Sequence, residues 1–449
     1  MKTLLERAKG SALHITASWT DPVGAVTLFS PHTAQIRFLS FVHNIWKDIQ
    51  RFSEVNSGPL PLLHTLRINA VDELNLDGPN VMTPPSLPLF TGAINLKEFV
   101  LQSERSPFLR HFVFPNLTKF QLLAQPAAEG FSALQLLNFL EASPMLRTVH
   151  MKIVDEILLE GVPQERVVVL PVVETFSLIV NDGEPGYELA ARVSCPSANH
   201  TSFMYERDVP SATLEEMFVF PTFVPWSAIT RQYTKRPVEG VELEIKFSRD
   251  PTIACFITFR SFDATTLKLG FQINESDEEE EFQMPFEEMH HKVFHQASRT
   301  IRDHPLLENI KRLDISHRAL FVDSDHFLSL SEEVEQLFKS VGPLEELTTF
   351  GCDLSLYFGP FPEHPESHSP TALPPVRRLT ISHPSYKRNK ELCMAAIVEL
   401  AKSRHALGIP FEHLTVAMER LPSVMAERLE PWVGAADCHE EVEPDYDYY

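Results

Sequence analysis

One short pattern of hydrophobic positions occurs twice within residues 95–122. An apolar residue is followed, three and five positions later, by two more that alternate with polar residues. The copies are Leu96-x-x-Phe99-x-Leu101 and Leu117-x-x-Phe120-x-Leu122. Such alternation is typical of a β-strand with one buried face, and repeated copies indicate a stacked array rather than a single globule.

The same pattern recurs on both sides of these two copies. On the N-terminal side a strand-like run covers 12–15, and copies start at Ile36 and Leu63. On the C-terminal side copies start at Leu146 and Val173, weaker ones at Ala198 and Ala264, and further copies at Ile310, Leu344, Val376 and Phe411. Most intervals are close to the roughly 20–29 residues of leucine-rich repeats, and the C-terminal ones are longer. The longer spacing leaves room for helices, which we expect at 331–341, 391–405 and 422–430, in addition to a short one at 4–9.

Prolines precede many copies of the pattern, among them Pro61, Pro115, Pro144 and Pro171. Proline has no backbone N–H, so it suits the approach to a strand better than the strand itself. The Asn or Cys that follows the strand in regular leucine-rich repeats is mostly missing, and only Gly351-Cys352-Asp353 comes near it. We therefore expect an irregular array.

The predicted fold class is α/β, an irregular leucine-rich-repeat solenoid with a parallel β-sheet horseshoe and with helices and loops on its outer face. The array covers 1–433, with its weakest repeats at 198–300 and an acidic insertion at 274–288. Residues 434–449 are predicted to form an acidic disordered tail. The acidic insertion is expected to be a solvated loop, and Ser276 within it is a candidate phosphorylation site.

Charge and cysteine usage narrow the function classes. The formal charge of −22 disfavours nucleic acid and anionic membranes, which need clustered Lys and Arg, and fits a protein partner better. Five cysteines, odd in number and without a C-x-x-C pair, indicate reduced thiols and an intracellular location, cytoplasmic or nuclear. Neither a signal peptide nor a membrane-spanning stretch is expected.

No catalytic motif is found in the sequence, so we expect no enzyme, no catalytic residue and no cofactor. The nearest approach to a metal motif is His291-x-x-x-His295, beside His290 and Glu287. The general-base Glu of an H-E-x-x-H site is replaced by Lys292, so a surface helix is favoured over a metal site. His364 and His368 are interpreted as polar groups of a proline-rich loop.

Several motifs in order give the chain a family resemblance. They are LLERAKGSALHITASW, HTAQIRFLSF, PLPLLHTLRI, FPNLTKFQLL, SPMLRTVHM, GPLEELTTFGCD and LPPVRRLTI, within residues 4–416. This set resembles the fungal F-box/leucine-rich-repeat-like proteins. The resemblance implies repeats that recruit a substrate and an N-terminal F-box that docks on the Skp adaptor of a cullin-RING ubiquitin ligase. No Leu-Pro-x-Glu-Leu-type F-box occurs here, so we expect either a truncated gene model or loss of the module, and Skp binding only if an upstream F-box exists.

The predicted function is a non-enzymatic scaffold for protein recognition, by resemblance the substrate-recruiting region of an F-box protein. The alternative is a repeat adaptor unrelated to ubiquitylation, including a helical-repeat scaffold. In leucine-rich repeats the positions between the leucines face the concave side. The candidate protein-binding surface is therefore Arg67, Lys97, Glu98, Lys119, Gln121, His150, Glu174, Ser177, Arg377, Arg378 and Thr380.

Overall fold

A computed structural model gives the fold. It describes residues 11–17, 30–55, 58–71, 89–103, 109–125, 130–154, 156–181, 183–209, 238–247, 252–261, 265–275, 297, 310–319, 337–338, 341, 343–350, 375–382, 390–418 and 424–440. The chain divides into two compact units. Unit 1 comprises 1–205 and 223–232, and unit 2 comprises 206–222 and 233–449. Each unit is treated by itself below.

Unit 1 is built on a parallel sheet. Its strands are β1 (Leu13–Ala17), β2 (Ile36–Ile45), β3 (Thr65–Val71), β4 (Glu98–Ser103), β5 (Lys119–Ala124), β7 (Thr148–Ile153), β10 (Thr175–Val180) and β12 (His200–Val209), which continues past Tyr205. They pair in the order β1-β2-β3-β4-β5-β7-β10-β12, and every one of these pairs is parallel. Strands in sequence order are therefore neighbours in the sheet, as in a stack of repeats.

A tight turn leads into most strands of unit 1, and it explains the prolines. The N–H groups of Leu63, Leu96, Leu117, Leu146 and Ala198 each donate to the carbonyl oxygen three residues earlier, at 3.1–3.3 Å. Proline occupies the second position of four of these turns, at 61, 115, 144 and 196. That position needs the backbone φ to which the proline ring is already fixed.

A second recurring hydrogen-bond pattern fixes the register between repeats. The N–H groups of Lys97 and Glu98 both donate to the carbonyl oxygen of His64, at 2.9 and 3.0 Å. The same two-to-one arrangement recurs at the starts of β5, β7, β10 and β12, and again at β17 in unit 2. Because each repeat bonds to the preceding one at the equivalent position, the phase of the burial pattern is conserved from strand to strand.

The core of unit 1 lies on one face of this sheet. From β4 to β10 the strands alternate partly exposed and buried residues, and the buried ones include Phe99, Phe120 and Phe176. The Phe99 ring lies 4.9–6.1 Å, centroid to centroid, from the rings of Phe112, Phe114, Phe120 and Phe139. Aromatic rings at these separations bury large apolar areas and pack edge to face or offset.

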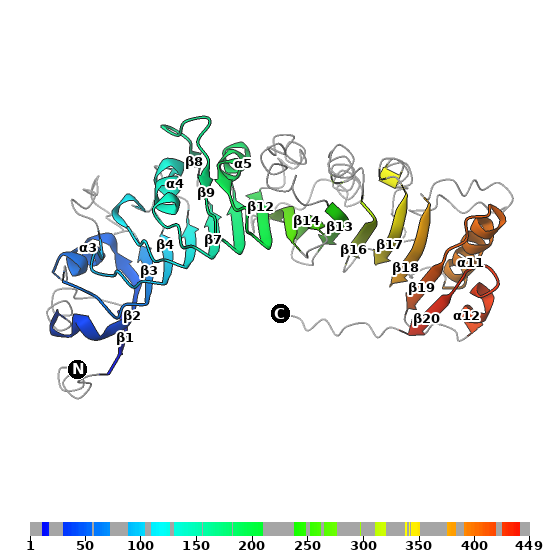
Figure 1. Ribbon diagram of the computed structural model, residues 1–449, viewed down its shortest axis with the longest axis horizontal. Coiled ribbons are helices and arrows are strands. Elements are labelled where there is room, and N and C mark those ends of the chain that lie inside the picture. Colours follow the sequence, from blue (N-terminus) through cyan, green and yellow to red (C-terminus); the bar gives the residue numbers. More distant parts are fainter. Residues whose placement is uncertain are drawn as a thin grey trace. The chain divides into compact units, whose positions relative to one another are not determined.

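Helices cover the core face of unit 1. They are α3 (Trp46–Val55), α4 (Ala133–Glu141) and α5 (Gly183–Ala191), with 3-10 turns η1 (Ser30–Gln35) and η2 (Leu109–His111). The ring of Phe139 of α4 lies tilted against that of Phe120, with ring centroids 4.6 Å apart, and Phe52 of α3 packs against Phe41 of β2. Figure 1 shows α3, α4 and α5 on the same side of the unit 1 strands. Two short parallel pairs join β6 (Phe131–Ser132) to β8 (Ile157–Leu158), and β9 (Val168–Val169) to β11 (Val193–Ser194).

Unit 2 has a mixed sheet. Its strands are β13 (Val238–Phe247), β14 (Thr252–Ser261), β15 (Thr266–Glu275), β16 (Arg312–Ala319), β17 (Leu344–Phe350), β18 (Val376–Ser382), β19 (His413–Met418) and β20 (Ala436–Glu440). Their order is β15-β14-β13-β16-β17-β18-β19-β20. The first two pairs are antiparallel, and those from β13–β16 onwards are parallel. The described helices of this unit are α11 (Lys390–Ala406) and α12 (Val424–Leu429).

The α/β class is confirmed, and the sheet in each unit is large and mostly parallel. Strands are present at the predicted copies of the pattern, and α11 and α12 match the helices expected at 391–405 and 422–430. The leucine-rich-repeat horseshoe stays a prediction. The expected helices at 4–9 and 331–341 lie wholly or mostly outside the described residues, as do Ser276, the histidines at 290, 291, 295, 364 and 368, and Cys352.

The chain divides into two compact units, and the single array over 1–433 stays a prediction. Two features differ from the sequence predictions. The gap before Ala264 holds β13 and β14, so β13, β14 and β15 form an antiparallel meander within a sheet predicted to be parallel. Residues 436–440 form β20, which pairs with β19, so the predicted disordered tail begins with a strand.

Candidate functional site

The face of the unit 1 sheet that points away from its helices carries most of the predicted binding residues. Phe99 and Phe120 point to the helix side, and strand side chains alternate between faces. Their neighbours Glu98, Lys119 and Gln121 therefore point to the other side. We call this surface the unit 1 strand face; it consists of Arg67, Asn69, Glu98, Val100, Gln102, Lys119, Gln121, Leu123, Thr148, His150, Lys152, Thr175, Ser177 and Ile179.

One carboxylate lies at the centre of an ion network on this face. Lys119 Nζ donates to Glu98 Oε1 at 3.1 Å, and Arg67 Nη2 lies 3.7 Å from the same oxygen. The three residues come from the adjacent strands β4, β5 and β3. The Glu98 side chain is 21% exposed, whereas Arg67 and Lys119 are 51% and 40% exposed. A single partly buried acid is thus shared by two bases that still reach solvent.

Neutral polar groups continue the row that starts at Arg67. The register pairs Arg67 with Val100, Val100 with Gln121, Gln121 with His150 and His150 with Ser177. Partial burial and the charge of Lys119 lower the pKa of His150 below its usual value. The imidazole is therefore neutral at physiological pH, and it offers one donor and one acceptor beside the amide of Gln121.

Three predicted residues lie beside the strand faces rather than on them. Lys97 and Glu174 immediately precede β4 and β10, and Arg377 has no partner in the β17–β18 register. Their side chains make contacts along the edge where the strands begin. Lys97 Nζ donates to the Asn116 carbonyl oxygen at 3.2 Å, Glu174 pairs with Arg147 at 2.9 Å, and Arg377 with Glu412 at 3.8 Å. The turn and the shared carbonyl interrupt the alternation just before β4 and β10, which moves Lys97 and Glu174 off the strand face, whereas Arg377 is the second residue of β18.

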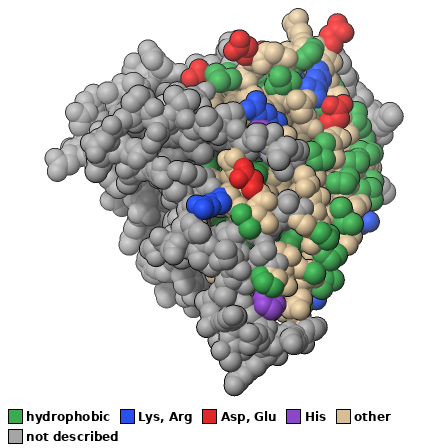
Figure 2. Space-filling model, turned by 90° about the vertical axis from the view of Figure 1, so that its left-hand side faces the viewer, with side chains coloured by type: hydrophobic (Ala, Val, Ile, Leu, Met, Phe, Trp, Pro, Cys, Tyr) green, Lys and Arg blue, Asp and Glu red, His purple; other side chains and the backbone are tan. Residues whose placement is uncertain are grey.

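The same edge of unit 1 presents apolar side chains to solvent. Leu62, Ile94, Met145 and Val172 lie shortly before β3, β4, β7 and β10, and they are 38–59% exposed. Asparagines alternate with them: the amides of Asn95 and Asn116 donate to the carbonyl oxygens of Pro61 and Ile94, both at 2.9 Å. Figure 2 shows hydrophobic side chains gathered in a band along one side of the described surface.

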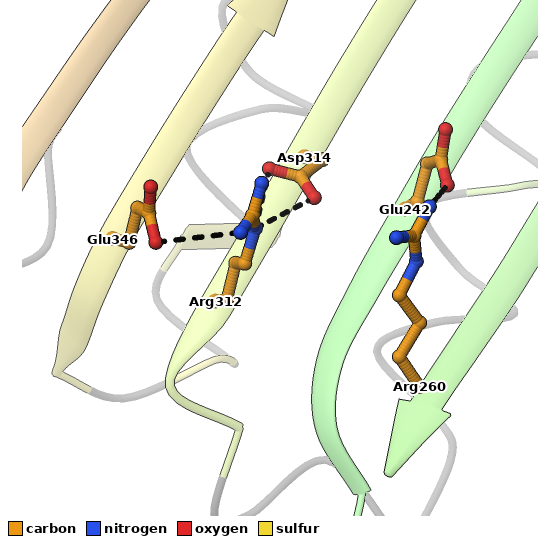
Figure 3. Close-up of polar contacts among 5 residues, drawn as sticks. All are labelled: Glu242, Arg260, Arg312, Asp314 and Glu346. Atoms are coloured by element: carbon orange, nitrogen blue, oxygen red, sulfur yellow. Dashed lines mark hydrogen bonds and ion pairs between the residues drawn. The ribbon is translucent and has the colours of Figure 1, made fainter. Parts of the chain in front are cut away.

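Unit 2 has its own ion network, which the sequence analysis missed. Arg312 Nε donates to both carboxylate oxygens of Asp314, at 2.9 and 3.1 Å, and its Nη1 lies 3.6 Å from Glu346 Oε2. Figure 3 shows Arg312 between these two acids, with Arg260 reaching Glu242 on the neighbouring strands. The alternation of charged and apolar residues in Arg312–Ile315 was a readable signal, but it was interpreted as strand formation alone. The same alternation in 241–246 was overlooked.

Burial and charge act in opposite directions on Arg312. Partial burial disfavours the charged guanidinium, but the hydrogen bond to Asp314 and the charges of Asp314, Glu346 and Glu242 raise its pKa above the usual value. The predicted residues Arg378 and Thr380 extend this face, because they pair in register with Glu346 and Thr348. We call the surface formed by Glu242, Arg260, Arg312, Asp314, Glu346, Thr348, Arg378 and Thr380 the unit 2 strand face.

Reactive or metal-binding groups are scarce in the part of the chain that the structure describes. Cys195 and Cys255 are buried free thiols, and burial raises the pKa of both, that of Cys195 to about 12. Thiols of this kind are poor nucleophiles. Among the described residues, no group of three or more His, Cys, Asp or Glu side chains could hold a metal ion, and no helix is both long and apolar enough to cross a membrane.

Neither the family models nor the curated proteins include a match to this chain.

Proposed function

We propose that this protein is a recognition scaffold that binds another protein through the unit 1 strand face and performs no chemistry itself. The observation that carries the proposal is the register. Successive parallel strands bring Arg67, Gln121, His150 and Ser177 into one row that no described helix covers. A rigid sheet holds such side chains in fixed positions at little entropic cost, which suits recognition.

The composition of the row also supports binding. Basic, amide, imidazole and hydroxyl groups lie beside the apolar Val100 and Ile179, a mixture that matches the polar and apolar composition of transient protein interfaces. By its resemblance to the fungal F-box/leucine-rich-repeat-like proteins, the scaffold would recruit a substrate to a cullin-RING ubiquitin ligase, and it would bind Skp only if an upstream F-box exists. An adaptor role unrelated to ubiquitylation is the second candidate.

The test is affinity purification of the full-length gene product from its native cell, followed by direct binding measurements with each co-purifying protein. The triple variant Arg67→Ala/Gln121→Ala/His150→Ala should weaken the authentic interaction at least about tenfold, since it truncates the centre of the row. The control variant Arg147→Ala/Glu174→Ala removes an exposed ion pair from the edge of the same unit and should leave the affinity unchanged.

The outcomes separate the candidates. Loss of binding in the triple variant alone supports recognition by the unit 1 strand face. Equal binding by both variants and the unsubstituted protein contradicts it. Skp and cullin among the purified proteins would favour ubiquitin-ligase recruitment, and their absence from a purification that retains the partner would favour the adaptor role.

A further inference from the structure

The unit 1 strand face has a charge opposite to that of the chain as a whole. The chain carries a formal charge of −22. On the unit 1 strand face the charged residues are three bases, Arg67, Lys119 and Lys152, and one acid, Glu98. A local positive surface on an acidic protein attracts negatively charged groups to that place and repels them elsewhere.

The two bases at the centre of this face keep much of their capacity to bind. Arg67 and Lys119 share one carboxylate oxygen, and the Arg67 contact, at 3.7 Å, is too long for a hydrogen bond. A guanidinium carries five N–H donors and an ammonium three, so Glu98 uses a small part of them. Both side chains are also at least 40% exposed.

Taken together, these observations lead us to propose that the unit 1 strand face binds an extended acidic segment of a partner protein, with carboxylates held by Arg67 and Lys119. This inference rests on the proposed function and specifies the partner's chemistry. Carboxylates form the charge-assisted hydrogen bonds that guanidinium and ammonium groups favour. The neutral Gln121 and His150 next to Lys119 offer further donors without adding repulsion.

The spacing of the strands sets the spacing of the acids. The backbones of β3 and β5 are about 10 Å apart across the sheet. The cationic groups of Arg67 and Lys119 lie closer than that, because both contact Glu98 Oε1, but both side chains are long and can separate when they leave it. In a polyproline-type extended segment, side chains three residues apart lie on the same side and about 9 Å from each other, within reach of the separated bases.

The probe is a fluorescein-labelled peptide of about 12 residues, with Glu at every third position and Ser and Pro between. Its anisotropy is titrated with the full chain at about 50 mM salt, and a peptide with Gln in place of Glu serves as the ligand control. Arg67→Gln/Lys119→Gln should weaken binding of the acidic peptide at least about tenfold. Arg147→Gln/Arg377→Gln removes two exposed edge bases, the same net charge, and should change it less than about twofold.

A variant that should bind the acidic peptide more tightly serves as a further control, because misfolding can explain a loss of binding but not a gain. Glu98→Gln releases both bases from their shared acid and should tighten binding of the acidic peptide several-fold. Circular dichroism of each variant should match that of the unsubstituted protein. Equal effects of the two double variants, or no gain from Glu98→Gln, would overturn the proposal, as would tighter binding of a labelled oligothymidine through Arg67 and Lys119.

The results distinguish failure of the acidic-segment proposal from failure of the proposed function. If a partner protein depends on the unit 1 strand face but the Gln peptide binds as well as the Glu peptide, the face recognises protein and the acidic partner is wrong. If no partner depends on this face, the proposed function itself is wrong.

Discussion

The two strand faces carry ion networks of inverted charge at equivalent places. In unit 1 the acid Glu98 lies between two bases, and in unit 2 the base Arg312 lies between two acids. Both central residues directly precede the first core-facing residue of their strand, Phe99 and Leu313. The backbone position thus determines where a network forms, while the side chains determine its sign.

The inversion gives the two faces different capacities. The short Asp314 is only 15% exposed and bonds Arg312 through both carboxylate oxygens, so the central base of unit 2 is held firmly. In unit 1 the outer residues are the long, exposed Arg67 and Lys119, which can turn from Glu98 to a ligand at little cost. This difference supports the proposal that the unit 1 strand face binds the partner, and it gives the network of unit 2 a mainly structural part.

The largest effect should come from the packing beneath the unit 1 network. Phe99 is fully buried among four other aromatic rings, so Phe99→Ala should cost about 3–5 kcal/mol of folding free energy. Hydrogen-exchange mass spectrometry should show faster exchange in β3–β7 and little change in β16–β19. The outward-facing Val100→Ala, next in the same strand, is the control and should have little effect.

Such an experiment also tests whether the two units differ in stability. Equal acceleration of exchange in β16–β19 would mean that the two units unfold together, and their faces could then not be compared as energetically separate surfaces. Faster exchange in unit 1 alone would support that comparison.

The central charges should matter less than the core, and unequally. Arg312→Gln leaves Asp314 and Glu346 facing each other, and the short Asp314 cannot move away, so a loss of about 1 kcal/mol is expected. Glu98→Gln should cost less than about 0.5 kcal/mol, because Arg67 and Lys119 can separate into solvent. Urea unfolding at low salt and in about 1 M NaCl measures the loss of folding free energy in both variants. The difference between the two losses should shrink at high salt. A larger loss for Glu98→Gln would reverse the assignment.

Periodicity alone predicted the strands well because their cause is local. Each copy of the pattern supplies the apolar residues that one strand buries, so Ile36, Leu63 and Leu344 could be identified without knowledge of their neighbours. The meander was missed for a different reason. Val238-x-x-Val241-x-Leu243 fits the pattern and was overlooked. The short connection between β13 and β14, which fits an antiparallel hairpin, was overlooked with it.

The unit 1 strand face was only partly predictable for a similar reason. Alternation correctly placed Glu98, Lys119, Gln121, His150 and Ser177 on one face, since it depends on a single strand. The displacement of Lys97 and Glu174 to the edge depends on the carbonyl shared between repeats, which is a contact between distant residues. The sharing of Glu98 by bases from two other strands likewise required the register.

The smallest predicted effect is the titration of His150 beside the unit 1 network. Partial burial and Lys119 lower its pKa in the folded protein. The folded state therefore binds fewer protons than the unfolded state, so the contribution of His150 reduces the free energy of unfolding as pH falls through about 6.5. NMR with ¹³C-labelled histidine, assigned through His150→Gln, should give a pKa below 6.5. Lys119→Met should raise the pKa of His150, and the control Lys97→Met, at the strand edge, should leave it unchanged. An unchanged pKa in Lys119→Met would show that Lys119 does not act electrostatically on His150. The unit 1 strand face would then not be one electrostatic surface.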